Sequence, residues 1–334
     1  MIRAMMLLAA VCLSHPVWAG KNATICVFDV MAAAGDTVSL VRDFSLVAKA
    51  WDVDFVTRVY TDEKDVQRAY NNKECQAMVL PDFAVRDYNH LMGSFSAVGS
   101  IQSNQLAAAM IRALSSPKAA HLMIEKQHEV AGIIPVGSVF VMNNNRQMTK
   151  LSDAIGKRFM ALENDPVYFR MIEAFGAKPV IVSLAKYGAV FNGGGADIIA
   201  APAALYQPFE LYRGIGTTGA AVRYPVLYLS LNLVIDPKAF PAGFGQRSRN
   251  WFVGQLPRLM GNINKVEQQI PEKIWQDITV EEQAAYGKLM REMRRRFIAD
   301  GTYNARMLAI VQRTQCALDA THYNCDAQAR VASK

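Results

Sequence analysis

Two glycine-rich stretches are the first candidates for chemistry, because backbone N–H groups at the start of a helix can hold phosphate. The first is the triplet at 193–195 in "FNGGGADIIAAP", and the second is "GIGTTG" at 214–219, which has dinucleotide-loop spacing. Phosphate loops leave the carboxyl end of a strand and enter a helix. The triplet instead enters a strand, and "GIGTTG" precedes the strand-like run 220–235. Neither stretch therefore predicts a nucleotide site.

Acidic side chains are concentrated where short apolar strands are expected to end. Asp29 ends "TICVFD", Asp82 follows "CQAMVLP" and Glu163 ends "GKRFMALE". Ligands of open α/β lobes bind outside the carboxyl ends of the strands, so these carboxylates are candidates for contacts with a ligand. Helix capping is the alternative for Asp82 and for Asp165, which Pro166 follows at the first expected helical position.

The same edge of the expected sheet adds further candidates for a binding cleft. Tyr206 lies one helical turn beyond Pro202, so its ring could stack on a ligand or pack between helices. We expect the cleft to be lined by Asp29, Pro81, Asp82, Arg86, Glu163, Pro202 and Tyr206.

Motifs of catalysis and of metal binding are missing from the sequence. There is no Gly-x-Ser-x-Gly, His-Glu-x-x-His or phosphate-loop motif, and no paired nucleophile and base is recognisable. Cys-x-x-Cys is also missing, and ligand spacing is lacking among His90, His121, His128 and His322. We therefore expect a protein that is not an enzyme and that uses no metal or other cofactor.

Residues 1–19 have the pattern of a secretory signal peptide. Arg3 supplies the positive start, an apolar stretch covers 4–13, and small residues precede a cleavage site near Ala19. No later stretch offers the roughly 18–20 apolar residues that a membrane helix needs. We expect the mature chain to begin near Gly20, to reside in the periplasm and not to span the membrane.

Four cysteines remain when the signal peptide, which contains Cys12, is removed. An even number of cysteines in an exported chain indicates disulfides. Four cysteines allow three pairings. The short separation of Cys316 and Cys325 favours a bond between them, which leaves Cys26 to pair with Cys75.

The net charge argues against nucleic acid as a partner. The chain has 36 basic and 29 acidic residues, a formal charge of +7. The densest basic run, at 291–296, falls in the last turns of an expected helix, where cations interact favourably with the helix dipole. We therefore interpret this run as a solvated helix end and expect no binding of nucleic acid.

Short apolar strands alternate with helical stretches along the chain. In the first half the strand-like segments are "TICVFDV", "DFVTRVY" and "CQAMVLP", and in the second half they are "GKRFMALE", "KPVIVSL" and "ADIIAAP". Such alternation is typical of α/β layers with mostly parallel strands.

The two halves also contain a local repeat. Aligning "AYNNKECQAMVLP" at 69–81 with "VFNGGGADIIAAP" at 190–202 places an aromatic residue, an asparagine and a final proline at matching positions. We expect the aromatic residue to end a helix, the asparagine to tolerate a left-handed cap and the proline to end a buried strand. The first copy has Asn-Lys-Glu in place of three glycines, so the turn accepts side chains. The repeat predicts two similar lobes.

Two long runs are expected to connect these lobes. "GIIPVGSVFVMNN" can bend at Pro135 and Gly137, and the run 220–235 is interrupted by Pro225. Two crossings between α/β lobes define a hinged cleft. We expect lobe I at 20–134, with the chain returning to it from about 232, lobe II at 135–231, and C-terminal helices that pack on the lobes at 238–334.

The segment 151–198 carries a resemblance to a known family. Gly156 and Lys157 enter one strand, "GAKP" at 176–179 enters the next, and a G-x-x-D pattern from Gly194 to Asp197 enters a third. This order resembles the receptor subunits of tripartite ATP-independent periplasmic (TRAP) transporters. The resemblance implies a two-lobe, periplasmic-binding-protein-like fold with a hinged cleft, a small-molecule solute as ligand and a membrane transporter component as partner.

The chain as a whole is most similar to a less characterised solute-binding branch of that superfamily. Members of this branch have Phe-Asp at the end of the first strand, before Gly-Asp, and a tail with cysteines. The corresponding residues here are Phe28, Asp29, Gly35 and Asp36.

One position departs from the TRAP pattern. The resemblance places an arginine four residues after the strand-entry glycine, where it holds the carboxylate of the ligand. This sequence has Met160 there, and Arg158 lies two residues earlier on the same face of the strand. Arg158 is therefore the candidate substitute for ligand binding. Met160 and the acids at the rim favour a polar or partly cationic solute over a simple monocarboxylate.

Together these features predict an exported receptor for a small solute. The alternative is an accessory protein of an efflux or other envelope assembly that kept the fold and lost its ligand. An apolar or collapsed cleft would favour the accessory protein, whereas converging polar groups in an open cleft would favour the receptor.

Overall fold

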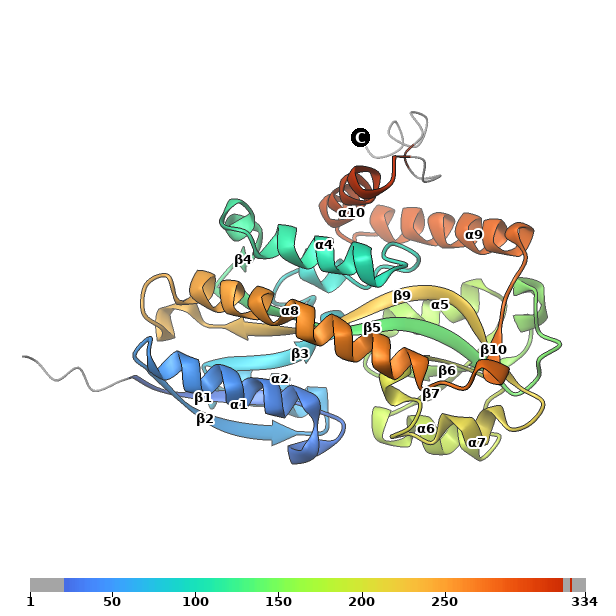
Figure 1. The fold of residues 1–334 in the computed structure, drawn as a ribbon, viewed down its shortest axis with the longest axis horizontal. Helices are drawn as coiled ribbons and strands as arrows, with labels where there is room; N and C mark the ends of the chain where they lie inside the picture. The colour runs from blue at the N-terminus through green and yellow to red at the C-terminus, as the bar shows by residue number, and fades with distance from the viewer. Residues whose placement is uncertain (1–20, 321–324, 326–334) are drawn as a thin grey trace, which may run out of the picture.

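The computed structural model describes residues 21–320 and 325 of the chain (Figure 1). Within these residues, one ten-stranded sheet has the order β2-β1-β3-β9-β5-β8-β6-β7, with β10 paired to β9 and β4 to β5. The strands are β1 (Lys21–Phe28), β2 (Val53–Tyr60), β3 (Ala77–Pro81), β4 (Ile124–Glu125), β5 (His128–Asn143), β6 (Arg158–Leu162), β7 (Lys178–Val182), β8 (Ile198–Pro202), β9 (Ala220–Ile235) and β10 (Trp275–Gln276).

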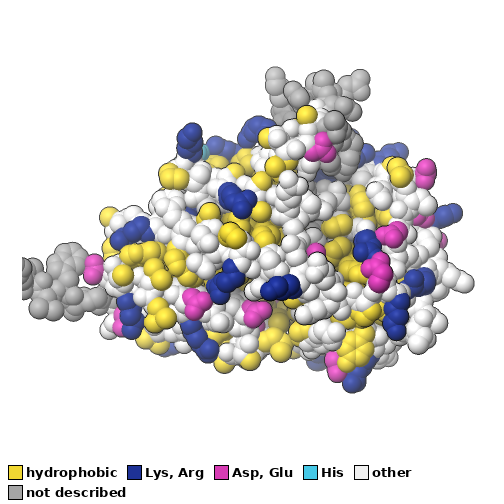
Figure 2. Space-filling model, in the orientation of Figure 1, with side chains coloured by type: hydrophobic (Ala, Val, Ile, Leu, Met, Phe, Trp, Pro, Cys, Tyr) yellow, Lys and Arg dark blue, Asp and Glu magenta, His cyan; other side chains and the backbone are white. Residues whose placement is uncertain are grey.

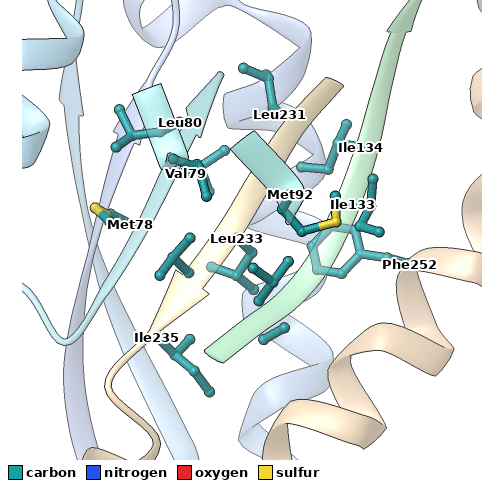
Figure 3. Close-up of a cluster of buried hydrophobic side chains, with 14 of the residues drawn as sticks. Met78, Val79, Leu80, Met92, Ile133, Ile134, Leu231, Leu233, Ile235 and Phe252 are labelled. Carbon is teal, nitrogen blue, oxygen red and sulfur yellow. The ribbon is translucent and has the colours of Figure 1, made fainter. Parts of the chain in front are cut away.

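Lobe I is built on the parallel strands β1, β2 and β3. Its helices are α1 (Asp36–Lys49), α2 (Glu63–Asn71), the short α3 (Asp82–Val85) and α4 (Asn104–Ser115). In the core, Val79 of β3 lies opposite Leu233 of β9, and Phe252 reaches the same cluster from a long helix, α8 (Phe244–Gln268) (Figure 3). The C-terminal part of the chain therefore completes the first lobe.

Lobe II repeats this plan with β6 parallel to both β7 and β8. Its helices are α5 (Pro166–Ala174), α6 (Leu184–Asn192) and α7 (Leu211–Ile215). The apolar faces of β6, β8 and α6 meet in a separate cluster that includes Met160, Tyr187 and Phe191. The two-lobe α/β architecture expected from the sequence is confirmed.

The strands β5 and β9 run side by side through both lobes (Figure 1). They are antiparallel over nearly their whole length, and β9 pairs with β3 in lobe I while β5 pairs with β8 in lobe II. The β5–β9 register shifts between Pro135 and Gly137 and again at Phe140, which faces Pro225. Bulges of this kind bend a strand, and they occur at the positions expected for the crossings.

The backbone conformation of Gly137 and its packing against α8 both favour a residue without a side chain. Its φ is +127°, and a Cβ atom at this position would lie 3.2 Å from Cγ2 of Ile263 on α8. Glycine therefore permits both the unusual backbone conformation and the close approach of α8 to the crossing strand.

Two further helices, α9 (Val280–Ala299) and α10 (Ala305–Leu318), follow α8. Thr279 and Glu282 form a capping box at the start of α9, which satisfies backbone N–H groups that have no partner within the helix. Met290, Met293 and Phe297 lie on one face of α9 and are buried in a cluster with residues of α5, β6 and β8. Basic and acidic side chains are interspersed over the face of the molecule in Figure 2.

Both expected disulfides are confirmed. Cys26 of β1 is bonded to Cys75 in the turn before β3, and Cys316 of α10 is bonded to Cys325. The predicted signal peptide, 1–19, lies outside the described residues. Within the described part of the chain, no helix combines the length and the apolar character needed to cross a membrane.

The local repeat corresponds to equivalent structures in the two lobes. α2 and α6 end at Asn71 and Asn192, and the strands that follow end at Pro81 and Pro202. The left-handed residues are Lys73, with φ +64°, and Gly194, with φ +73°, and not the asparagines as expected. The asparagines remain helical because their side chains bond to the segments beyond the strands: Asn71 accepts from Tyr88 Oη, and Asn192 donates to Phe209 O.

Candidate functional site

A pocket of about 410 Å³ lies between the lobes. Lobe I contributes residues within 28–40, from the end of β1 to the first turns of α1, and lobe II contributes residues within 162–208. The crossing strands add residues of 134–139 and 227–231, and α8 adds residues of 259–267. Both lobes, both crossing strands and α8 therefore contribute to the wall.

The walls are mainly apolar and carry charge of one sign. Four aromatic side chains contribute to them, Phe28, Phe83, Tyr168 and Tyr187, together with many aliphatic ones. The charged residues in the lining are Asp29, Asp36, Asp165 and Glu267, and no lysine, arginine or histidine lines this pocket in the described part of the chain. The lining is more apolar than the acidic rim expected from the sequence, because the crossing strands and α8 contribute aliphatic side chains.

Asp29 lines the pocket, but its carboxylate also organises the loop after β1. Oδ1 accepts from Met31 N at 2.9 Å, and Oδ2 accepts from Thr37 N at 3.1 Å, near the start of α1. Gly35 packs against this carboxylate so closely that an added Cβ atom would lie 1.9 Å from either oxygen. Asp29 therefore places a negative charge at the wall while fixing the wall's shape.

Asp82 lies behind the wall. It is fully buried, and it accepts hydrogen bonds from Phe83 N at 2.8 Å, Ser230 N at 3.0 Å and Ser230 Oγ at 3.2 Å. Burial raises the pKa of this carboxyl to about 7, against the opposing effect of these bonds. Because Ser230 belongs to the crossing strand β9 and lines the pocket, these bonds connect the end of β3 to the crossing strand.

Asp165 is a helix cap that also lines the pocket. Its Oδ1 accepts from the N–H groups of Val167 and Tyr168, each at 3.2 Å, at the start of α5. Burial raises the pKa of this carboxyl, and the positive charge of Arg86 opposes the shift. Arg86 is half-buried and donates to Gly93 O at 3.1 Å. It is not among the residues that line the pocket.

Glu163 belongs to a contact between the lobes and not to the pocket lining. Its Oε1 lies 3.4 Å from Lys64 Nζ of α2, and both side chains are largely exposed. The next residue, Asn164, donates from Nδ2 to Glu63 Oε1 at 2.7 Å. Glu63 is 2% exposed, and burial raises its pKa. The start of α2 and the loop between β6 and α5 therefore join the lobes directly.

The structure places Arg158 at the amino end of β6, on the side of the strand away from the expected cleft. Its guanidinium forms a bidentate pair with Asp197, with Nη2 2.7 Å from Oδ1 and Nε 3.2 Å from Oδ2. Met160 is fully buried among the aromatic residues of lobe II. Neither residue lines the pocket, so no arginine is available where the family pattern places one.

The strand-terminal prolines and Tyr206 have different positions. Pro81 and Pro202 both line the pocket. Tyr206 is 3% exposed, its ring centroid lies 6.1 Å from that of Tyr212, and it belongs to the lobe II core. Of the two roles open to Tyr206 in the sequence, the structure shows packing between helices.

Sequence reasoning missed the contribution of α8 and of its acid, Glu267. Leu259, Ile263 and Glu267 recur every four residues and share one face of α8, which lines the pocket. A signal was present, because this spacing places a carboxylate on an otherwise apolar helix face. The Oε2 atom accepts from Asn104 Nδ2 at 3.3 Å, and the Oε1 atom is buried without a hydrogen-bond partner among the described residues.

The fold is shared with solved structures of TRAP periplasmic solute-binding proteins. One from Desulfovibrio salexigens, with bound orotic acid, has a TM-score of 0.72 at 11% identity over 89% of this chain and 99% of that one. One from Haemophilus influenzae, with bound L-gulonate, has a TM-score of 0.71 at 11% identity over 88% of this chain and 99% of that one. At this identity the likeness shows the fold alone.

Sequence comparison gives a closer relationship. "Probable solute-binding protein AdeT1" of Acinetobacter baumannii is 34% identical over 298 residues, which are 89% of this chain and 98% of that protein. "Probable solute-binding protein AdeT2" of the same organism is 29% identical over 234 residues, 70% of this chain and 98% of that protein. The model of the family described as solute-binding protein AdeT 1/2 matches residues 44–329. The chain belongs to this family of solute-binding proteins.

Proposed function

We propose that the protein is an exported receptor that captures a small molecule between its lobes and delivers it to a membrane transporter component. The observation that carries this proposal is the pocket of about 410 Å³, to which both lobes, both crossing strands and α8 contribute. A pocket of this size can enclose a small organic molecule. Residues 1–19 would direct the chain to the periplasm, where the mature protein would meet its solute.

Closure of the lobes follows from the same geometry. We place lobe I at 20–134, joined by the chain from about 232, and lobe II at 135–231. Bending at Pro135 to Gly137 and near Pro225 would bring the lobes together, because β5 and β9 are the strands that pass between them. The C-terminal helices, within 238–334, would accompany the lobes on which they pack.

A second candidate, an accessory protein of an efflux or other envelope assembly, is kept because the pocket walls are mainly apolar and lack the family's arginine. The two functions differ in a measurable property. A receptor binds a small molecule in this pocket, whereas an accessory protein leaves the pocket empty.

Native mass spectrometry of protein purified without refolding tests the proposal. We expect a mass above that of the polypeptide, which falls to the polypeptide mass on denaturation. Ala204→Trp would introduce a large side chain at an exposed position of the pocket wall, and it should abolish the added mass. Ala189→Trp on α6, exposed and outside the lining, is the matched control. A wild-type mass equal to that of the polypeptide would favour the accessory protein.

A further inference from the structure

We propose that the solute is an apolar organic cation and that Glu267 determines this preference. The proposal rests on the receptor function above and names the chemical class that the same pocket would select. It goes beyond the family pattern, in which an arginine holds a carboxylate, because the charge in this pocket is of the opposite sign.

Among the lining carboxylates of the described chain, Glu267 is distinguished by a buried oxygen that lacks a hydrogen-bond partner. Asp29 uses both of its oxygens on backbone N–H groups, and Asp165 uses Oδ1 to cap α5. In Glu267, Oε2 accepts from Asn104 Nδ2 and the backbone N–H of Ser138 lies near the carboxylate, while Oε1 is buried with no donor in hydrogen-bond geometry among the described residues. A buried carboxylate oxygen without a donor is costly. An ammonium group entering the pocket would supply that donor.

The position of Glu267 directs its free oxygen toward the hinge. Its Oε1 atom lies 3.9 Å from the point that a Cβ atom of Gly137 would occupy on β5. Burial raises the pKa of Glu267, while Asn104 and the nearby backbone N–H of Ser138 oppose that shift. A cation bound at Oε1 would favour the ionised carboxylate further and would be held between α8 and the crossing strand.

The remaining walls accommodate the rest of such a solute. The faces of Phe28, Phe83, Tyr168 and Tyr187 offer apolar area, and aromatic faces attract cations. Asp36 is exposed at the start of α1 and adds a fourth negative charge to the lining. A carboxylate ligand would meet these acids with no lysine, arginine or histidine among the described lining residues to pair with, so the pocket disfavours it.

Three ligands of matched size test the proposal by titration calorimetry near pH 7: 4-phenylbutylamine, 4-phenyl-1-butanol and 4-phenylbutyrate. They share an apolar body and differ in the charge of the end group, since an alkylamine stays protonated at this pH. We expect the amine to bind at least about tenfold more tightly than the alcohol, and the carboxylate to bind most weakly.

A substitution tests whether Glu267 causes the preference for the amine over the alcohol. Glu267→Gln should reduce the preference for the amine over the alcohol to within about twofold, and Glu173→Gln, an exposed acid of α5 outside the pocket, should leave it unchanged. If the Glu267→Gln protein prefers the amine over the alcohol as strongly as the wild-type protein does, Glu267 does not determine the preference. The ligand series on the wild-type protein does not depend on the folding of any variant.

The outcomes separate this inference from the receptor function. Tighter binding of 4-phenylbutyrate than of the amine would overturn the cation proposal and leave a receptor of the opposite preference. No binding of the amine at millimolar concentration would also overturn it, and the mass spectrum of the purified protein would then decide independently whether a solute is bound.

Discussion

Pro81 and Pro202 occupy equivalent positions in the two lobes and line the same pocket. Pro81 ends β3 opposite Leu231 of β9, and Pro202 ends β8 opposite Val139 of β5. In each lobe, a strand that ends in proline pairs with one of the two crossing strands: β3 pairs with β9 in lobe I, and β8 pairs with β5 in lobe II. The pocket lies where the two copies of this arrangement face each other, and the predictions below test the contacts that hold it together.

Loss of the Cys26–Cys75 disulfide should destabilise lobe I. The bond spans 49 positions, and the chain-entropy model gives it a stabilisation of about 4 kcal/mol. The double variant Cys26→Ala with Cys75→Ala should lower the free energy of unfolding in urea by that order. Removal of Cys316–Cys325, which spans 9 positions, is the control and should cost about 3 kcal/mol or less. Equal losses in the two variants would contradict the model.

Asp82 should make the protein less stable as pH rises. Its pKa is about 7 in the folded protein and 3.8 ordinarily, so the folded state binds the proton more tightly. The resulting stability is present below about pH 4 and is lost as pH rises to about 7, by at most about 4 kcal/mol for three pKa units. Asp82→Asn should remove this slope in urea unfolding at pH 5 and pH 8. A slope equal to that of the wild type would exclude Asp82 as its source.

Asn164→Ala should favour the open arrangement of the lobes. The substitution leaves the buried Glu63 without its donor from lobe II, at a cost of roughly 1–3 kcal/mol to the closed form. We expect a larger radius of gyration in small-angle scattering and weaker binding of solute, because less of the protein is closed.

The exposed pair Lys64–Glu163 supplies the control for that experiment. Lys64→Ala removes a contact between the same two segments, but exposed pairs contribute only about 0–1 kcal/mol. The radius of gyration should stay near the wild-type value. If Asn164→Ala behaves like Lys64→Ala, the buried hydrogen bond does not hold the lobes together.

Gly137→Ala should be more destabilising than an alanine at another glycine with positive φ. At Gly137 the added methyl group would lie 3.2 Å from Ile263, whereas at Gly156, with φ +73°, it would meet no atom within 4 Å. We expect about 1 kcal/mol for Gly156→Ala from backbone strain, and roughly 2–3 kcal/mol for Gly137→Ala from strain and crowding together. Thermal unfolding of the two variants measures the difference.

The fold could be predicted because its signals are local and repeated. Strand-terminal prolines, apolar runs of fixed length and the crossings at Pro135 and Pro225 are all visible in short windows of sequence. The disulfides followed from the number and spacing of the cysteines. These features can be recognised from the local sequence alone, without knowing which residues contact them in the folded protein.

The site could be predicted only in part, because the destination of a side chain depends on distant neighbours. Asp29 and Asp82 were placed near the pocket, but backbone N–H groups occupy their oxygens. The strand position of Arg158 suggests a role in ligand binding, but Asp197, 39 residues later in the sequence, holds its guanidinium at the amino end of β6. The spacing of Leu259, Ile263 and Glu267 indicates an apolar face of α8 with one carboxylate, but it does not indicate that this face packs against the crossing strands.

The pairing of β3 with β9 has a consequence for how the protein folds. Ala77 lies opposite Ile235, and Phe252 of α8 completes the same core, so the first lobe lacks its central partners until most of the chain has been synthesised. Lobe II is nearly continuous in sequence. Contacts between residues so distant in sequence slow folding, since a long loop must close first. The newly made chain should therefore complete the fold of its N-terminal lobe later than that of lobe II.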